Sequence, residues 1–234
     1  YKDSEVTEVV QSLVSNPSVL KALMGLQFPG LVSKLPFMKF FVKQKLISKA
    51  KTINTISDYQ MLFKSLMEKV IQESISSFTV NGLDKLSADD SYLFISNHRD
   101  ITLDAALLAF KLHQSNFQTF NIAVGNNLME ETWASDLFRL NKSFIIQRSG
   151  ASKKEIYSGL SMASKFIHQS IFKENNSVWI AQKQGRAKDG IDETDPALLK
   201  MIHLSERKSQ SIASYFNSLK VVPVSVSYEY DPND

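Results

Sequence analysis

Residues 92–108 of the chain read YLFISNHRDITLDAALL. The apolar run at 92–95 has the length of a buried strand, and the Ala- and Leu-rich segment after Asp104 favours a helix. One imidazole, His98, and two carboxylates, Asp100 and Asp104, lie between them. A strand that ends in a polar turn before a helix is typical of an α/β domain, which presents functional groups at the carboxyl ends of its strands.

The chain around this stretch alternates between strand and helix patterns. A strand followed by a turn at Asn81-Gly82 is predicted within 78–86. The later predicted strands are 91–96, 119–124, 143–147, 177–181 and 220–228. The predicted helices between them are 103–113, 127–139, 152–170 and stretches within 195–217. Such alternation predicts an α/β fold, with a mostly parallel sheet flanked by helices on both faces.

Residues 1–77 are predicted to form a helical extension ahead of an α/β domain at 78–234. Its predicted helices are 4–15, 17–28, 31–50 and 58–77. Between Val9 and Ile56 there are seven lysines and no Asp or Glu, which leaves 20 basic residues against 24 acidic ones elsewhere. The net charge of +3 therefore arises from one segment and not from the protein as a whole.

Helix 31–50 is expected to place its apolar and Lys side chains on opposite faces. The residues that make this pattern are Phe37, Phe40 and Phe41, and Lys34, Lys39 and Lys43. A helix lying in the interface of an anionic membrane needs this separation. The pattern therefore predicts a membrane-surface region, and an ordinary helix packing on the domain is the alternative.

The composition excludes several kinds of chemistry. The chain has no Cys, so it has no disulfide, no thiolate zinc site and no Cys nucleophile. It has neither a Gly-x-Ser-x-Gly elbow nor an apolar run long enough to span a bilayer. A His near a carboxylate can accept and return a proton. In the absence of an obvious protein nucleophile, His98 is expected to activate a hydroxyl of the substrate, without a covalent intermediate.

A cationic loop follows the apolar strand at 177–181. Its residues Gly185, Arg186 and Lys188 suit an anion, because a glycine lets backbone N–H groups approach closely and Arg matches phosphate geometry. Arg148 stands at the end of another apolar strand. A solvated basic turn is the alternative interpretation of this loop.

Four blocks follow one another in a recognisable order. They are Asn97-His98 with a following Asp, then Ile145-Ile146-Gln147-Arg148, then Trp179-Ile180-Ala181 with Gly185-Arg186, then Val222-Pro223-Val224. This order, over about residues 78–228, resembles the glycerolipid acyltransferase family, the glycerol-3-phosphate and 1-acylglycerol-3-phosphate acyltransferases.

The resemblance implies an acyl transfer from acyl-coenzyme A or acyl carrier protein to a hydroxyl of glycerol 3-phosphate or 1-acylglycerol 3-phosphate (lysophosphatidic acid), in phospholipid synthesis. His98 would be the general base, an Asp would orient it, and Arg148, Arg186 and Lys188 would hold the phosphate. It further implies no metal, no bound cofactor, no nucleic-acid partner, and a peripheral position on the cytoplasmic face of a membrane.

Three positions depart from the family pattern, one of them at Asn141-Lys142, where the family's second block usually opens with Gly. The family's Asp usually stands five residues after the His, where this chain has Leu103. Asp104 is the favoured partner because a carboxylate suits the start of a helix, and Asp100 is the other candidate. Gln184 stands where the family usually has Glu. These departures leave a second hypothesis: a lipid- or acyl-carrier-binding protein of the same fold with weak or no activity.

Overall fold

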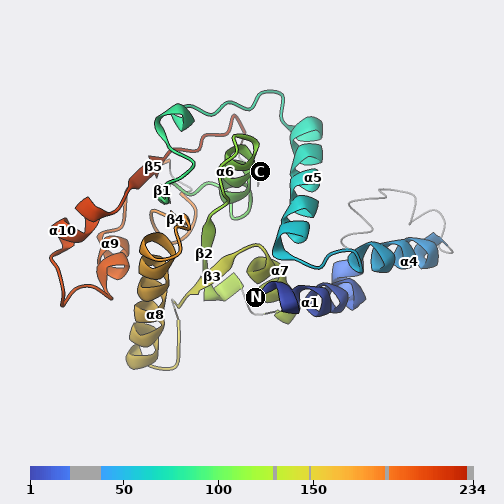
Figure 1. The fold of residues 1–234 in the computed structure, drawn as a ribbon, viewed down its shortest axis with the longest axis horizontal. Helices are drawn as coiled ribbons and strands as arrows, with labels where there is room; N and C mark the ends of the chain where they lie inside the picture. Colours follow the sequence, from blue (N-terminus) through green and yellow to red (C-terminus); the bar gives the residue numbers. More distant parts are fainter. Residues whose placement is uncertain (22–37, 129–130, 148, 188–189, 231–234) are drawn as a thin grey trace. The chain divides into compact units, whose positions relative to one another are not determined.

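The computed structural model describes residues 1–21, 38–128, 131–147, 149–187 and 190–230 (Figure 1). The chain forms two compact units. One comprises residues 1–66 and 128–142, and the other residues 67–127 together with the chain from Ser143 onward.

The second unit is built on a five-stranded sheet in which every pairing is parallel. The strands are β1 (Leu93–Ser96), β2 (Asn121–Gly125), β3 (Ser143–Ile146), β4 (Val178–Ala181) and β5 (Val221–Val224). Their order across the sheet is β3-β2-β4-β1-β5, so β1 and β4 lie side by side near one edge. The predicted α/β fold with a mostly parallel sheet is confirmed.

Helices of the second unit cover both faces of this sheet. They are α6 (Leu103–Gln114), α8 (Lys153–Phe172), α9 (Pro196–His203) and α10 (Ile212–Ser218). Three of them begin with a side chain that accepts a backbone N–H of the first turn: Ser152 for α8, Asp195 for α9 and Ser211 for α10. Such caps satisfy donors that have no partner within the helix.

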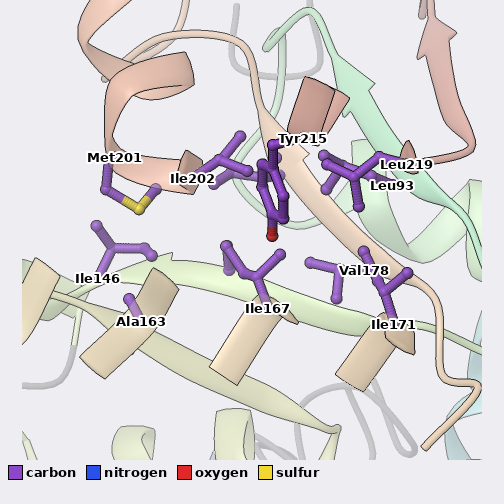
Figure 2. Close-up of a cluster of buried hydrophobic side chains, with 12 residues drawn as sticks. Leu93, Ile146, Ala163, Ile167, Ile171, Val178, Met201, Ile202, Tyr215 and Leu219 are labelled. Atoms are coloured by element: carbon purple, nitrogen blue, oxygen red, sulfur yellow. The ribbon is translucent and has the colours of Figure 1, made fainter. Parts of the chain in front are cut away.

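Alternate residues of each strand enter two different cores. On β1, Leu93 joins the cluster formed with α8, α9 and α10, whereas Phe94 joins the cluster formed with α6. Figure 2 shows the first cluster, in which Ile167 of α8 lies close to Tyr215 of α10 and Ile171 lies beside Val178 of β4. Burial raises the pKa of the Tyr215 phenol to about 12, so this ring stays neutral. The two-residue period of a strand thus explains why the sheet is apolar on both faces.

The first unit is helical. It contains α1 (Asp3–Ser15), α4 (Met38–Ala50), the first part of α5 (Ile56–Ser74) and α7 (Thr132–Leu140). Its buried apolar residues come mainly from α1, α4, α5 and α7, with Val6, Ala50, Tyr59 and Leu140 among them. The N-terminal helical extension is confirmed, and α7 packs with it although it follows β2 in the sequence.

Several predicted elements differ from those found. No strand forms at 78–80, ahead of the predicted turn. The turn itself is found, with a left-handed φ of 88° at Gly82, and a short 3₁₀ helix, η1 (Leu83–Lys85), follows it. Its apolar residues Leu83 and Leu86, three positions apart, both pack against the cluster of α6. A 3₁₀ turn aligns such a pair on one side, which a strand cannot do.

Three predicted helices also differ in their bounds. The predicted helix 127–139 is divided into η2 (Asn126–Leu128) and α7, which begins at Thr132. Residues 17–21 are helical, and the rest of the predicted helix 17–28 lies outside the described residues. The predicted helix 31–50 is described only from Met38, as α4.

The predicted membrane-surface residues lie in or before α4. Lys34 and Phe37, and the side chain of Lys39, lie outside what the structure describes. Phe40 and Phe41 are exposed by 63% and 65%, and their rings contact each other at 5.8 Å between centroids.

The faces of α4 are not separated as predicted. Lys43 is exposed but stands three residues before the buried Leu46, so a charged and an apolar side chain share one side of the helix. No helix among the described residues is long and apolar enough to cross a membrane.

Candidate active site

The turn after β1 brings His98 and Asp104 together. His98 Nδ1 lies 3.0 Å from Asp104 Oδ2, and the two side chains are 14% and 0% exposed. The backbone N–H groups of Arg99 and Asp100 donate to the same oxygen, at 2.8 and 3.0 Å. These donors offset the cost of burying a carboxylate, because a buried charge is tolerated only when it is hydrogen-bonded.

This pairing assigns the proton on the imidazole. A carboxylate can only accept, so the bond to Asp104 places the hydrogen on Nδ1 of His98 and leaves Nε2 as an acceptor. The ring of Trp179, from the neighbouring strand β4, meets the imidazole at 72° with 6.4 Å between centroids. His98 is therefore oriented on one nitrogen and able to take a proton on the other, as a general base requires.

The Asp100 side chain hydrogen-bonds the backbone that leads into α6. Its Oδ1 accepts the backbone N–H of Thr102 at 2.8 Å and that of Leu103 at 2.6 Å, which caps the first turn of α6. The carboxylate that contacts the His98 ring is that of Asp104. The favoured choice between the two carboxylates is thus the one found in the structure.

The cationic loop begins beside this pair because β4 and β1 are neighbours. Gln182 N–H donates to the Ser96 carbonyl at 2.7 Å, and Ala187 N–H donates to the His98 carbonyl at 2.8 Å. The loop is therefore held against the His98 turn at both ends.

Of the predicted phosphate-binding residues, the structure describes Gly185 and Arg186, which directly precede Ala187 in the loop. Gly185 has a left-handed φ of 77°, a backbone conformation that glycine adopts without strain. Arg186 is half-buried, and Gln184 is exposed beside Gly185. Arg148 and Lys188 lie outside the described residues.

A second set of contacts was not predicted. Arg99 donates to Asp192 Oδ2 at 2.6 Å and to the Ala187 carbonyl at 3.3 Å. Asn97 Nδ2 donates to the same Asp192 oxygen at 3.1 Å. These bonds tie the far side of the cationic loop to the His98 turn. Asp192 stands in an acidic stretch of the sequence, and nothing in its spacing pointed to Arg99 as a partner.

The chain after β5 also reaches the site, which sequence reasoning missed. Tyr228 Oη donates to Asp104 Oδ1 at 2.9 Å. The Asn97 side chain makes two hydrogen bonds with the backbone of Val226, accepting its N–H at 2.7 Å and donating to its carbonyl at 2.9 Å. Beyond Val224, the chain is therefore bonded to the Asn97 side chain and not to the backbone of β1. β5 accordingly ends at Val224 and not at the predicted residue 228.

The site is suited to proton transfer next to a bound anion. The described part of the chain contains no group of three or more His, Asp or Glu side chains that could hold a metal ion. An imidazole oriented by a carboxylate and a loop with cationic side chains thus lie at the carboxyl ends of two adjacent strands.

Comparison with known protein families gives a match over the site. The family model described as Acyltransferase matches residues 77–206. No curated protein matches the sequence. The matched residues make up more than half of the chain and include His98, Asp104 and the cationic loop. The chain therefore belongs to the acyltransferase family that includes the glycerolipid acyltransferases, and it has an acyl-transfer role in lipid metabolism.

Proposed function

We propose that the protein is an O-acyltransferase of phospholipid synthesis. It moves a fatty acyl group from acyl-coenzyme A or acyl carrier protein to a hydroxyl of glycerol 3-phosphate or 1-acylglycerol 3-phosphate. The observation that supports this best is the buried His98–Asp104 pair, whose Nε2 is available as a proton acceptor. The proposal needs no metal and no bound cofactor, since the acyl thioester is a co-substrate.

The reaction follows from this pair. The acceptor hydroxyl gives its proton to His98 Nε2 while its oxygen attacks the thioester carbonyl carbon. Asp104 stabilises the resulting imidazolium through Nδ1. The tetrahedral intermediate then collapses, the C–S bond breaks, and the proton passes from Nε2 to the departing thiolate. The products are an ester and a free thiol, with no acyl group attached to the protein.

The phosphate of the acceptor is proposed to bind at the cationic loop. This rests on the hydrogen bond from Ala187 to the His98 carbonyl, because Gly185 and Arg186 directly precede Ala187 in the loop. Arg148 and Lys188 are proposed to add charge. Fixing the phosphate aligns the hydroxyl with the thioester, and such positioning can supply several kcal/mol of the lowering of the barrier.

Replacing Arg186 by alanine should raise the KM for the phosphorylated acceptor by roughly tenfold, with a smaller change in kcat, because a charge-assisted bond to phosphate is lost. Steady-state kinetics with the acceptor as the varied substrate measure this. Arg207→Ala is the matched control, since the Arg207 guanidinium stacks on Tyr157 at 5.5 Å from the ring centroid. An unchanged KM in Arg186→Ala would show that the phosphate binds elsewhere.

An acceptor panel tests the proposed function. Purified protein is given radiolabelled acyl-coenzyme A or acyl carrier protein with glycerol 3-phosphate, 1-acylglycerol 3-phosphate or glycerol. The expected result is release of free thiol and formation of a labelled ester only with a phosphorylated acceptor. Binding of acyl donor or lipid without thiol release would support the lipid- or carrier-binding protein of the same fold instead.

Peripheral association with the cytoplasmic face of an anionic membrane is the remaining part of the proposal. It rests on the Lys-rich segment and on the exposed Phe40 and Phe41 beside Lys43. We expect the protein to sediment with vesicles that contain anionic lipid and to be released by salt, because surface charge attraction is screened. Equal binding to neutral and anionic vesicles would contradict the electrostatic contribution.

A further inference from the structure

We infer that Tyr228 is a positioning residue of the His98–Asp104 pair, holding the carboxylate through the oxygen that His98 does not use. This inference rests on the proposed function of that pair. Tyr228 lies after residue 206, where the family match ends. It is therefore a feature of the site that the match itself does not contain.

The hydrogen bonds of Asp104 divide between its two oxygens. Oδ2 accepts from His98 and from two backbone N–H groups of the turn, whereas Oδ1 accepts from Tyr228 at 2.9 Å. Rotation of the carboxylate about its χ2 bond would break contacts at both oxygens. A donor at Oδ1 therefore fixes the plane of the carboxylate, and with it the orientation of the imidazole.

Tyr228 is itself held on two sides. Two residues earlier, the backbone N–H and carbonyl of Val226 are both hydrogen-bonded to the Asn97 side chain. The Tyr228 ring packs against an apolar cluster formed by Met67 of α5 and by Leu107 and Phe110 of α6. Backbone and ring are thus both fixed, so the hydroxyl is presented to Asp104 in one place.

The surroundings keep this hydroxyl protonated. Burial raises the pKa of the Tyr228 phenol far above its ordinary value, and the adjacent Asp104 and Asp100 carboxylates raise it further. The groups that face it are these two carboxylates, with His98 behind Asp104, while α5 and α6 contribute apolar side chains. Tyr228 is therefore a neutral donor at any pH at which the reaction runs.

The hydrogen bond from Tyr228 to Asp104 also affects how strongly the His98–Asp104 pair holds the transferred proton. A donor at Oδ1 disperses negative charge that would otherwise act on the imidazolium. His98 can then return the proton to the leaving thiolate more readily. Without the donor, the full charge of the carboxylate acts on the imidazolium, and the proton on Nε2 is returned less readily.

The test is Tyr228→Phe, which keeps the ring in its apolar cluster and removes only the hydroxyl. We expect kcat for acyl transfer to fall on the order of tenfold, with the acceptor KM within about twofold of the wild type. The acidic limb of the pH profile of kcat/KM should move to higher pH. Tyr230→Phe is the control, because Tyr230 lies on the same segment and is 80% exposed.

A double-mutant cycle separates positioning from a purely structural role. In an Asp104→Asn background, Tyr228→Phe should lower kcat further by less than about twofold, since the partner carboxylate is already lost. Wild-type kcat and an unshifted pH profile in Tyr228→Phe would overturn the inference, as would a loss of activity matched by a loss of folded protein. Retained activity in His98→Ala would instead overturn the proposed function itself, whatever Tyr228→Phe shows.

Discussion

His98→Ala is expected to lower kcat for acyl transfer by about 10³- to 10⁴-fold, the upper part of the roughly 10²- to 10⁴-fold that general acid–base catalysis contributes. His98 is the base of the proposed mechanism, and its Nδ1 is already engaged by Asp104. Removing the imidazole leaves the acceptor hydroxyl to lose its proton to water. The measurement is the rate of thiol release from acyl-coenzyme A at saturating glycerol 3-phosphate or 1-acylglycerol 3-phosphate.

His113→Ala is the matched control for this experiment. His113 lies exposed near the end of α6, the helix that begins at the active-site turn. The control should keep wild-type kcat, and both variants should unfold at a temperature close to that of the wild type. Acyl transfer at more than about a tenth of the wild-type rate in His98→Ala would remove the general-base mechanism.

Asp104→Asn is expected to have the second largest effect, a loss in kcat on the order of 10³-fold. The substitution keeps the size and shape of the side chain but replaces one oxygen by an NH₂ donor. If that donor faces His98 Nδ1, the ring must carry its proton on Nε2. The imidazole can then no longer accept the proton of the acceptor hydroxyl.

Asp100→Asn is the control for Asp104→Asn. An Asn side chain can still accept the N–H groups of Thr102 and Leu103, so the cap of α6 should persist. Because the cap is kept, kcat of Asp100→Asn should stay within roughly a few-fold of the wild-type value. If Asp100→Asn proved the more damaging of the two substitutions, the pairing of His98 with Asp104 would not be the catalytic one.

Much of the fold was predictable because short apolar runs and helix-forming segments alternate along the second unit. The strands at 93–96 and 178–181 and the helix from Leu103 were predicted within two residues of their bounds. The turn at Asn81-Gly82 was predicted, whereas the strand ahead of it is absent and the 3₁₀ turn at Leu83–Lys85 was not predicted. Leu83 and Leu86 pack against the cluster of α6, and local sequence does not contain that information.

The site was predictable to the extent that its residues are close in sequence. His98, Asp100 and Asp104 fall within one turn, and the start of a helix favoured Asp104. Tyr228 is 124 residues from Asp104, and its part in the site depends on the order of strands in the sheet. That order places β5 next to β1, and no spacing rule within the sequence predicts it.

The position of β5 in the sheet determines which C-terminal truncations of the chain are compatible with folding. A fragment ended at residue 206, where the family match ends, would lack α10, β5 and Tyr228. The backbone of β1 would then be left unpaired on one side, directly below His98. An uncovered apolar strand invites pairing with other chains, so such a fragment is expected to aggregate. A soluble, active piece of this protein must therefore extend past Tyr228.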